Sequence, residues 1–110
     1  MKSDFSCWIY ILTNKTNTVL YVGRTVDIKY RTSQHRIGIF QNSFTAHYNV
    51  TKLVYLEEFS TYEEAAIREH QLKSGSRQKK IDLISQCNPD WKDLSTEWDN
   101  DDRRLRRSSR

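Results

Sequence analysis

The chain has 110 residues, of which 36% are hydrophobic, 29% charged and 12% aromatic. This length suits one domain with its own core, and the composition excludes a wholly disordered chain. The sequence contains no apolar run close to the roughly 20 residues of a membrane span, and its N-terminus lacks the apolar stretch of a secretory signal. We therefore expect a cytoplasmic protein with no membrane partner.

The net charge is +4, and the positive charge is concentrated near the C-terminus. Residues 99–110 hold five Arg and three Asp with a single apolar side chain. We therefore predict a folded domain over residues 1–98 and a basic, disordered tail over residues 99–110. Cys7 and Cys87 are far apart and lack the spacing of a zinc site, which favours reduced thiols.

Two apolar, β-branched segments near the N-terminus predict a β-hairpin. They span residues 7–13 and 19–23 and flank the polar segment NKTNT, which is typical of a turn. Each segment carries one central tyrosine, Tyr10 or Tyr21. We expect these two residues to pair opposite each other, because a slip of one residue would place their rings on different faces.

A helix is predicted next, over residues 26–37, and then a third strand over residues 51–58. Thr25 is placed to cap the helix, and Asp27 lies in the first turn, where the helix dipole favours a negative charge. The third strand is indicated by the β-branched and aromatic residues of TKLVYLEE.

Two further helices complete the predicted fold. The S-x-x-E pattern from Ser60 to Glu63 predicts a helix from about residue 61, with Gly75 ending it in the C′ position. Ser76 is placed to cap a last helix over residues 77–87, which the following Asn-Pro pair ends. The order β-β-α-β-α-α predicts an α/β (α+β) domain with a small three-stranded, mainly antiparallel sheet flanked by helices.

One carboxylate lies on the apolar side of the first of these two helices. At about 100° per residue, Glu69 falls between Ala65 and Ala66 on a stripe that also includes Tyr62 and Leu72. A buried Glu needs a cationic partner or a metal ion. One reading is a metal ligand, and the other is a Glu69 at the edge of the stripe that pairs with an Arg or Lys.

The helix over residues 26–37 also carries polar groups on its inner face. Ile28, Arg31 and His35 share one face, and the last two are i, i+4 neighbours. A guanidinium fits a phosphate, and a histidine exchanges protons near neutral pH. The alternative is structural, with Arg31 bonded to Glu69 and His35 satisfied at the edge of the sheet.

These residues occur in an order that resembles the GIY-YIG nuclease domain, over about residues 6–98. Within that superfamily the chain is similar to the small, single-domain bacterial proteins. The resemblance rests on Trp8-Ile9-Tyr10, Tyr21-Val22-Gly23, Arg31, His35 and Glu69, and on the runs IYILTN, KLVY-x-EEF, RE-x-QLK and NP-x-WKDLS. Trp8 replaces the first glycine of the family motif and Val22 replaces its isoleucine, which leaves both tyrosines in place.

The resemblance implies hydrolysis of a nucleic-acid phosphodiester bond with a divalent metal, Mg²⁺ or Mn²⁺. It implies that Glu69 binds the metal and that Arg31 binds the oxygens of the phosphate. We expect Tyr10 to be the base, His35 to accept its proton, and Tyr21 to bind water or phosphate; the two tyrosine roles are interchangeable. Asn88 is a weak candidate for the asparagine that many members place beside the metal.

Positive charge near these residues predicts a nucleic-acid partner, DNA first and RNA second. The predicted phosphate-binding residues, which we call the basic strip, are Arg24, Lys73, Arg77, Lys79 and Lys80. The alternative reading of the strip is a solvated helix face. No residues remain for a separate DNA-reading domain, so we predict structure-directed or low-specificity cleavage.

Two other functions fit the same sequence. The first is a nucleic-acid-binding module of the same fold without turnover. The second is a protein-interaction domain that uses exposed tryptophans as anchors, with Trp8, Trp91 and Trp98 as candidates. Retention of both tyrosines and Glu69 favours the nuclease, because a pure binding module has no need for a carboxylate on the core side of a helix.

Overall fold

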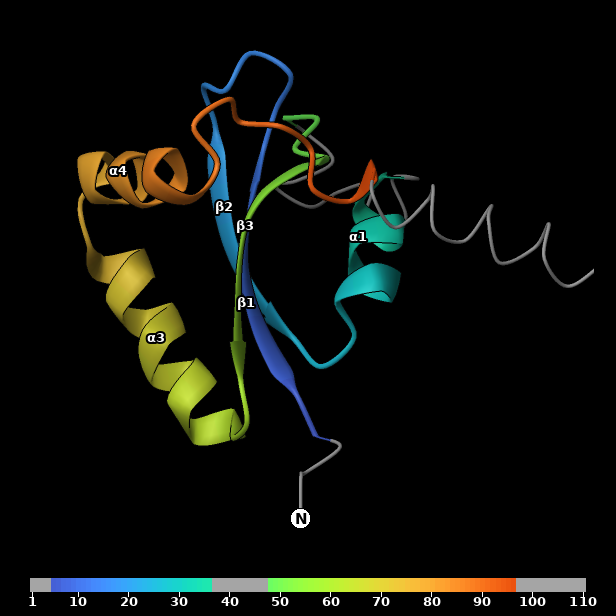
Figure 1. Cartoon of the computed structure of the whole chain (residues 1–110), viewed down its shortest axis with the longest axis vertical. Coiled ribbons are helices and arrows are strands. Elements are labelled where there is room, and N and C mark those ends of the chain that lie inside the picture. Colours follow the sequence, from blue (N-terminus) through green and yellow to red (C-terminus); the bar gives the residue numbers. More distant parts are fainter. Residues whose placement is uncertain (1–4, 37–47, 97–110) are drawn as a thin grey trace, which may run out of the picture.

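The computed structural model describes residues 5–36 and 48–96, which form three layers (Figure 1). One helix covers one side of a three-stranded antiparallel sheet of order β2-β1-β3, and two helices cover the other side. This architecture confirms the predicted fold class. In chain order the elements are β1 (Cys7–Thr13), β2 (Leu20–Thr25), α1 (Ile28–Arg36), β3 (Lys52–Phe59), α3 (Tyr62–Ser74) and α4 (Arg77–Cys87).

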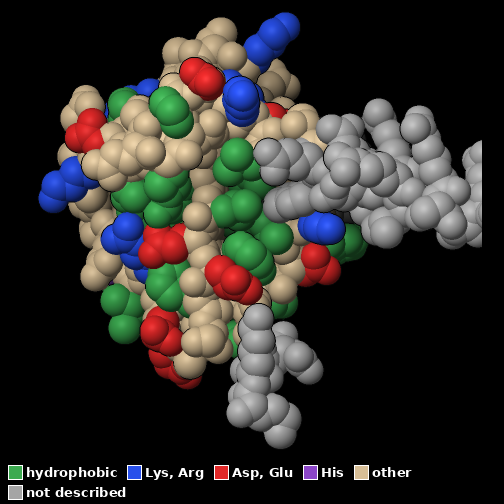
Figure 2. All heavy atoms as spheres, viewed as in Figure 1, with side chains coloured by type: hydrophobic (Ala, Val, Ile, Leu, Met, Phe, Trp, Pro, Cys, Tyr) green, Lys and Arg blue, Asp and Glu red, His purple; other side chains and the backbone are tan. Residues whose placement is uncertain are grey.

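The central strand β1 is buried on both faces, which explains its uninterrupted apolar sequence. Ile9 and Ile11 join the core cluster that packs against α3 and α4. Tyr10 and Leu12 point to the opposite face and join a second cluster with Ile28 of α1. Figure 2 shows hydrophobic side chains in the middle of this view of the molecule, with charged side chains among and around them. The sheet therefore separates two cores, and its two edge strands border both.

The Asn14 side chain orders the turn between β1 and β2. Asn14 Oδ1 accepts hydrogen bonds from the N–H groups of Thr18, at 2.8 Å, and Val19, at 3.0 Å. Asn17 has φ of 59°, a left-handed conformation that asparagine tolerates well. These contacts confirm the predicted hairpin.

The register of the hairpin differs from the prediction by two residues. Tyr10 lies opposite Gly23, and Tyr21 lies opposite Leu12, so the expected pairing of Tyr10 with Tyr21 is wrong. The reason is steric: the Tyr10 ring lies across Gly23, where a Cβ atom would be 2.2 Å from Tyr10 Cζ. Because side chains alternate along a strand, a shift of two residues keeps both rings on one face. Their centroids are 6.3 Å apart.

The first helix begins two residues later than predicted. Its N-cap is Asp27, whose Oδ1 accepts a hydrogen bond from the N–H of Tyr30 at 3.1 Å. Thr25 does not cap α1; its Oγ1 accepts from the N–H of Asp27 at 3.1 Å and so orders the turn before the helix. A carboxylate at the N-cap satisfies a free helix N–H and also interacts well with the helix dipole.

The cap of α3 is shifted by one residue from the prediction. Thr61, rather than Ser60, accepts a hydrogen bond from the N–H of Glu64, at 3.2 Å. Gly75 ends the helix as predicted, but with φ of −77°, so its conformation is not left-handed. Ser76 caps α4 as predicted, through the N–H of Lys79.

The segment after α4 returns to the sheet. The N–H of Leu94 donates to the carbonyl of Leu53 at 2.8 Å, and Asp93 Oδ1 accepts from the N–H of Leu53. The run NP-x-WKDLS therefore holds the C-terminal segment against β3. The predicted boundary after residue 98 and the tail over residues 99–110 lie outside the described residues. Among the residues described, no helix combines the length and apolarity required to cross a lipid bilayer.

Candidate nuclease site

Tyr10 is the buried member of the tyrosine pair, with 1% of its surface exposed. Burial raises the pKa of Tyr10 above its usual value, and the neighbouring Tyr21 adds to the rise. The positive charge of Arg31 lowers that pKa, and the negative charge of Glu69 raises it. Tyr10 therefore stays protonated at neutral pH. It lies close enough to Arg31 and Glu69 for their charges to affect its pKa.

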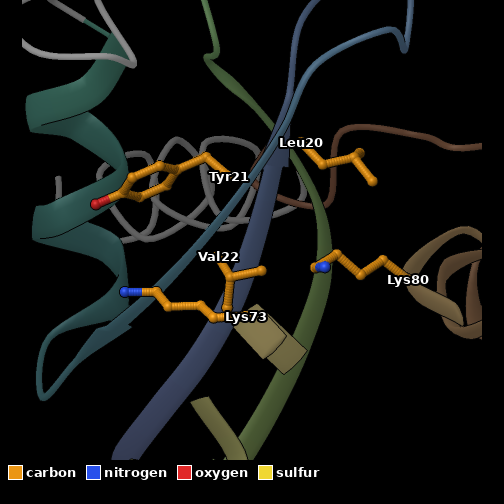
Figure 3. Close-up of a pocket in the computed structure, with 5 residues that line it drawn as sticks. All are labelled: Leu20, Tyr21, Val22, Lys73 and Lys80. Carbon is orange, nitrogen blue, oxygen red and sulfur yellow. The ribbon is translucent and has the colours of Figure 1, made fainter. Parts of the chain in front are cut away.

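Tyr21 is half-buried and lines a shallow pocket of about 390 Å³ on edge strand β2. Lys73 of α3 and Lys80 of α4 line the same pocket, together with Leu20 and Val22. Figure 3 shows the Tyr21 phenol and the Lys73 ammonium group both extending toward α1, whereas Lys80 lies toward the other side of the strand. Tyr21 of β2 and Lys73 of α3 therefore border the same solvent-accessible pocket.

Glu69 lies beside this pocket and is paired with two cations. Its Oε2 is 3.2 Å from Lys73 Nζ, and its Oε1 is 3.6 Å from Arg24 Nη1. The Glu69 side chain is 17% exposed. Glu69 thus lies at the edge of the buried stripe and pairs with an Arg and a Lys, which was the second interpretation of its position. Tyr62 is 50% exposed and is not part of that stripe.

The structure gives Arg24 a contact that the sequence did not predict. We expected Arg24 to bind phosphate, and the alternative to a phosphate-binding Arg31 was a bond from Arg31 to Glu69. The structure pairs Glu69 with Arg24. Its Nη2 also donates to the Tyr62 hydroxyl at 2.9 Å, and its guanidinium lies 4.3 Å from the centre of the Tyr62 ring. The signal was present, because Arg24 is two residues after Val22 and so faces α3 with it.

Arg31 lies on α1, on the same face of the sheet as Tyr10. It is half-buried, and its positive charge lies near enough to lower the pKa of Tyr10. His35 lies one turn later in the same helix. Its side chain is outside the described part of the structure, so its role stays a prediction.

The donor set fits a magnesium-type ion bound by one carboxylate. Among residues 5–36 and 48–96 no cluster of three or more His, Cys, Asp or Glu side chains occurs. Mg²⁺ is commonly held by one or two carboxylates, several waters and substrate phosphates, whereas zinc needs three or four protein ligands. Glu69, which pairs with a lysine that lines the solvent-accessible pocket, can supply the one carboxylate that such a magnesium site needs.

Apart from Arg24, which is on β2, the residues of the basic strip lie around the junction of α3 and α4. A second pocket, of about 200 Å³, lies beside the first and shares Lys80 with it; Lys79 and Arg68 also line it. Lys80 Nζ donates to the carbonyl of Gly75 at 2.9 Å. Arg77 donates to the carbonyl of Thr18 at 2.8 Å, which ties α4 to the hairpin turn. Sequence reasoning missed Arg68, which also pairs with Glu57 at 3.1 Å.

Asn88 and two of the three tryptophans have structural contacts. The Asn88 amide donates to the carbonyls of Val54 and Lys92, and its oxygen accepts from the N–H of Lys92. The amide oxygen, the atom that would bind a metal, already accepts from Lys92, and Asn88 is buried, so we do not include it in the proposed metal site. Trp8 and Trp91 are half-buried and pack against the two core clusters; Trp98 lies outside the described residues.

Comparisons with known proteins show the family of the chain. Residues 6–82 match the family model of the GIY-YIG catalytic domain. The chain is 40% identical over 79 residues to a UPF0213 protein of Staphylococcus saprophyticus, which covers 72% of this chain and 94% of that protein. It is 37% identical over 83 residues to a UPF0213 protein of Syntrophus aciditrophicus, covering 76% and 93%.

A solved structure shares the fold. The solution NMR structure of a UPF0213 protein from Bacillus halodurans matches with a TM-score of 0.52 and 30% sequence identity. The match covers 80% of this chain and 92% of that one. The names of these relatives state no reaction, so the reaction has to be argued from the site.

Proposed function

Because the chain belongs to the GIY-YIG catalytic-domain family, we propose that it is a metal-dependent endonuclease that hydrolyses phosphodiester bonds of DNA. The observation that carries this proposal is the pocket on β2, which Tyr21 and Lys73 both line and whose Lys73 pairs with the Glu69 carboxylate at 3.2 Å. A phosphodiester in this pocket would lie against Tyr21 and Lys73, close to the carboxylate that would hold the metal.

Glu69 is the residue that would hold the metal. A bound Mg²⁺ or Mn²⁺ supplies positive charge that stabilises the negative charge developing on the phosphate. Arg31 binds the non-bridging phosphate oxygens, for which its planar guanidinium is suited. Arg24 positions Glu69 and is itself fixed by Tyr62.

Tyr21 is the better candidate for the base, which exchanges the roles that we first expected. A base must contact the attacking water, and Tyr21 borders the pocket whereas Tyr10 is 1% exposed. The raised pKa of Tyr10 keeps its phenol protonated, so Tyr10 acts as a hydrogen-bond donor. The Tyr21 phenol gives its own proton to His35, which keeps its predicted role as proton acceptor, and takes the proton of the attacking water in its place.

The substrate is nucleic acid bound through its backbone. The two pockets that share Lys80 form a basic path across the α3–α4 junction, which suits successive phosphates. Phosphate contacts carry no sequence information, so we propose cleavage with low sequence specificity, directed by the structure of the DNA.

The experiment that tests this proposal is incubation with labelled single-stranded, duplex and branched DNA and matched RNA, with Mg²⁺, with Mn²⁺ or with a chelator. We expect divalent-dependent cleavage of DNA, and a rate at least about 100-fold lower for Tyr21→Phe, the contribution typical of a general base. Binding without cleavage under every condition would instead support the non-catalytic nucleic-acid-binding module. Cleavage of RNA alone would reassign the substrate.

A further inference from the structure

Both oxygens of the Glu69 carboxylate face a cation of the protein itself. Oε1 faces Arg24 and Oε2 faces Lys73. Any divalent cation that binds Glu69 must compete with these two positive charges, which lie within ion-pair distance of the same oxygens. Without a metal ion, Arg24 and Lys73 therefore balance the negative charge of the Glu69 carboxylate.

The two cations differ in how firmly they are held. Arg24 is fixed on a second side by the hydroxyl and ring of Tyr62, and its side chain is 25% exposed. The Lys73 side chain is 55% exposed, and Glu69 is the partner that the described structure gives its ammonium group. Lys73 is one turn from Glu69 on α3 and has a flexible four-carbon stem, so it is the cation that can leave without disturbing the fold.

Lys73 also lines the pocket where the substrate phosphate would bind. Lys73 and Tyr21 border the same space, and both extend toward α1 (Figure 3). A backbone phosphate in that space offers Lys73 a new anion within its reach. The carboxylate and the phosphate thus compete for one ammonium group.

We propose that Lys73 couples substrate binding to metal binding. Without nucleic acid, Lys73 neutralises Oε2 of Glu69 and weakens the affinity of the site for a divalent cation. A backbone phosphate in the Tyr21 pocket draws Lys73 away, which frees Glu69 to bind the cation. Metal and nucleic acid therefore bind cooperatively, and each strengthens the other by the same factor. This inference rests on the proposed role of Glu69 as metal ligand.

The first test measures Mn²⁺ alone, by electron paramagnetic resonance, without nucleic acid. We expect Lys73→Met to tighten the Kd for Mn²⁺ by about twofold to fivefold, the range that a partly exposed ion pair supports. Lys80→Met is the matched control, because Lys80 borders the same pocket but bonds to Gly75 rather than Glu69. An unchanged Kd in Lys73→Met, or equal tightening in Lys80→Met, would overturn the proposal.

The second test measures the coupling, by the fluorescence anisotropy of a short labelled DNA duplex with and without Mn²⁺. All variants carry Tyr21→Phe to suppress turnover. Mn²⁺ should strengthen DNA binding when Lys73 is present, and Lys73→Met should reduce that strengthening by about the same twofold to fivefold. Lys73→Met should also weaken DNA binding in the presence of a chelator. A strengthening factor that is the same with and without Lys73 would contradict the coupling.

Glu69→Gln separates this inference from the proposed function. If Glu69→Gln abolishes Mn²⁺ binding and Lys73→Met leaves it unchanged, the metal site stands and the coupling fails. If Glu69→Gln binds Mn²⁺ as tightly as the wild type, the metal site itself is wrong. Circular dichroism melts of each variant show whether the protein is folded in these measurements.

Discussion

Gly23 connects the packing of the sheet to the candidate site. It lies opposite Tyr10, and the Tyr10 ring occupies the space where any larger residue would have its Cβ atom. This close approach buries Tyr10 and leaves Tyr21 at the border of the pocket. The glycine of the family motif is thus explained by a contact between side chain and backbone, without any demand for an unusual φ.

We expect Gly23→Ala to destabilise the protein by about 1–3 kcal/mol, the range for overpacking a core. Combining it with Tyr10→Leu should cost less than the sum of the two single changes, because the clash requires both side chains. Urea denaturation measures each free energy of unfolding. Gly75→Ala is the control, with φ of −77° and its nearest neighbour, Gln71 O, 3.2 Å from the added Cβ. Equal losses at the two glycines would exclude this role for Gly23.

The raised pKa of Tyr10 predicts a loss of stability at high pH. Above pH 10 the Tyr10 phenol ionises in the unfolded chain while burial keeps it protonated in the folded chain. The unfolded state then binds fewer protons, so the free energy of unfolding falls as pH rises. Tyr55, whose pKa is raised to about 12 by burial and by its bond to Glu57, adds to this loss.

We therefore expect Tyr10→Phe to make the free energy of unfolding less dependent on pH between 9 and 11. Denaturant titrations of both proteins at several pH values measure this slope. A wild-type slope that Tyr10→Phe leaves intact would show that the phenol ionises equally easily in both states.

At the scale of elements, the sequence predicted the order, type and approximate ends of all six strands and helices that the structure describes. Alternation and capping patterns are local, and such local signals also agree with the packing here. The errors were small shifts: two residues in the hairpin register and one or two at the helix caps. A shift of two leaves the pattern of inward-facing side chains unchanged, so periodicity alone could not detect it.

The ion pairs of Glu69 could not be predicted in the same way. Arg31 and Arg24 were both available in sequence, and only the path of β2 past α3 brings Arg24 to the carboxylate. The sequence did predict that Glu69 has to be compensated, because burial of a carboxylate has a general cost. The identity of the partner is a property of the tertiary structure.

The shifted cap of α3 can be tested directly. Thr61→Ala should lower the free energy of unfolding by about 1 kcal/mol, since Thr61 accepts a bond from the N–H of Glu64. Ser60→Ala is the matched control, one residue earlier and exposed, and should change it by much less. Thermal melts of the two variants decide the register of the cap. A larger effect at Ser60 would support the cap that the sequence pattern first indicated.

At the scale of the whole molecule, the basic path across α3 and α4 should govern affinity for nucleic acid. Replacing Lys79 and Lys80 with Ala should weaken binding to different sequences about equally and should lower the slope of log K against log salt by roughly one for each lost phosphate contact. Lys92→Ala, exposed beyond the far end of α4, is the control. Anisotropy titrations at several salt concentrations supply the slopes. Identical slopes in the double variant and the wild type would show that Lys79 and Lys80 are solvated and do not contact phosphates.

The central claim, a nuclease that depends on Glu69, is tested most directly by the rate of Mg²⁺-dependent DNA cleavage in the wild type and in Glu69→Gln. We predict a fall of about three orders of magnitude, because a catalytic metal contributes several kcal/mol to the transition state. Stability should change by about 1 kcal/mol or less, because both ion pairs of Glu69 are partly exposed and screened by solvent.

Glu63→Gln, an exposed carboxylate of the same helix, should cleave at the wild-type rate. Cleavage by Glu69→Gln at the wild-type rate, or cleavage by the wild type that a chelator does not stop, would contradict the account.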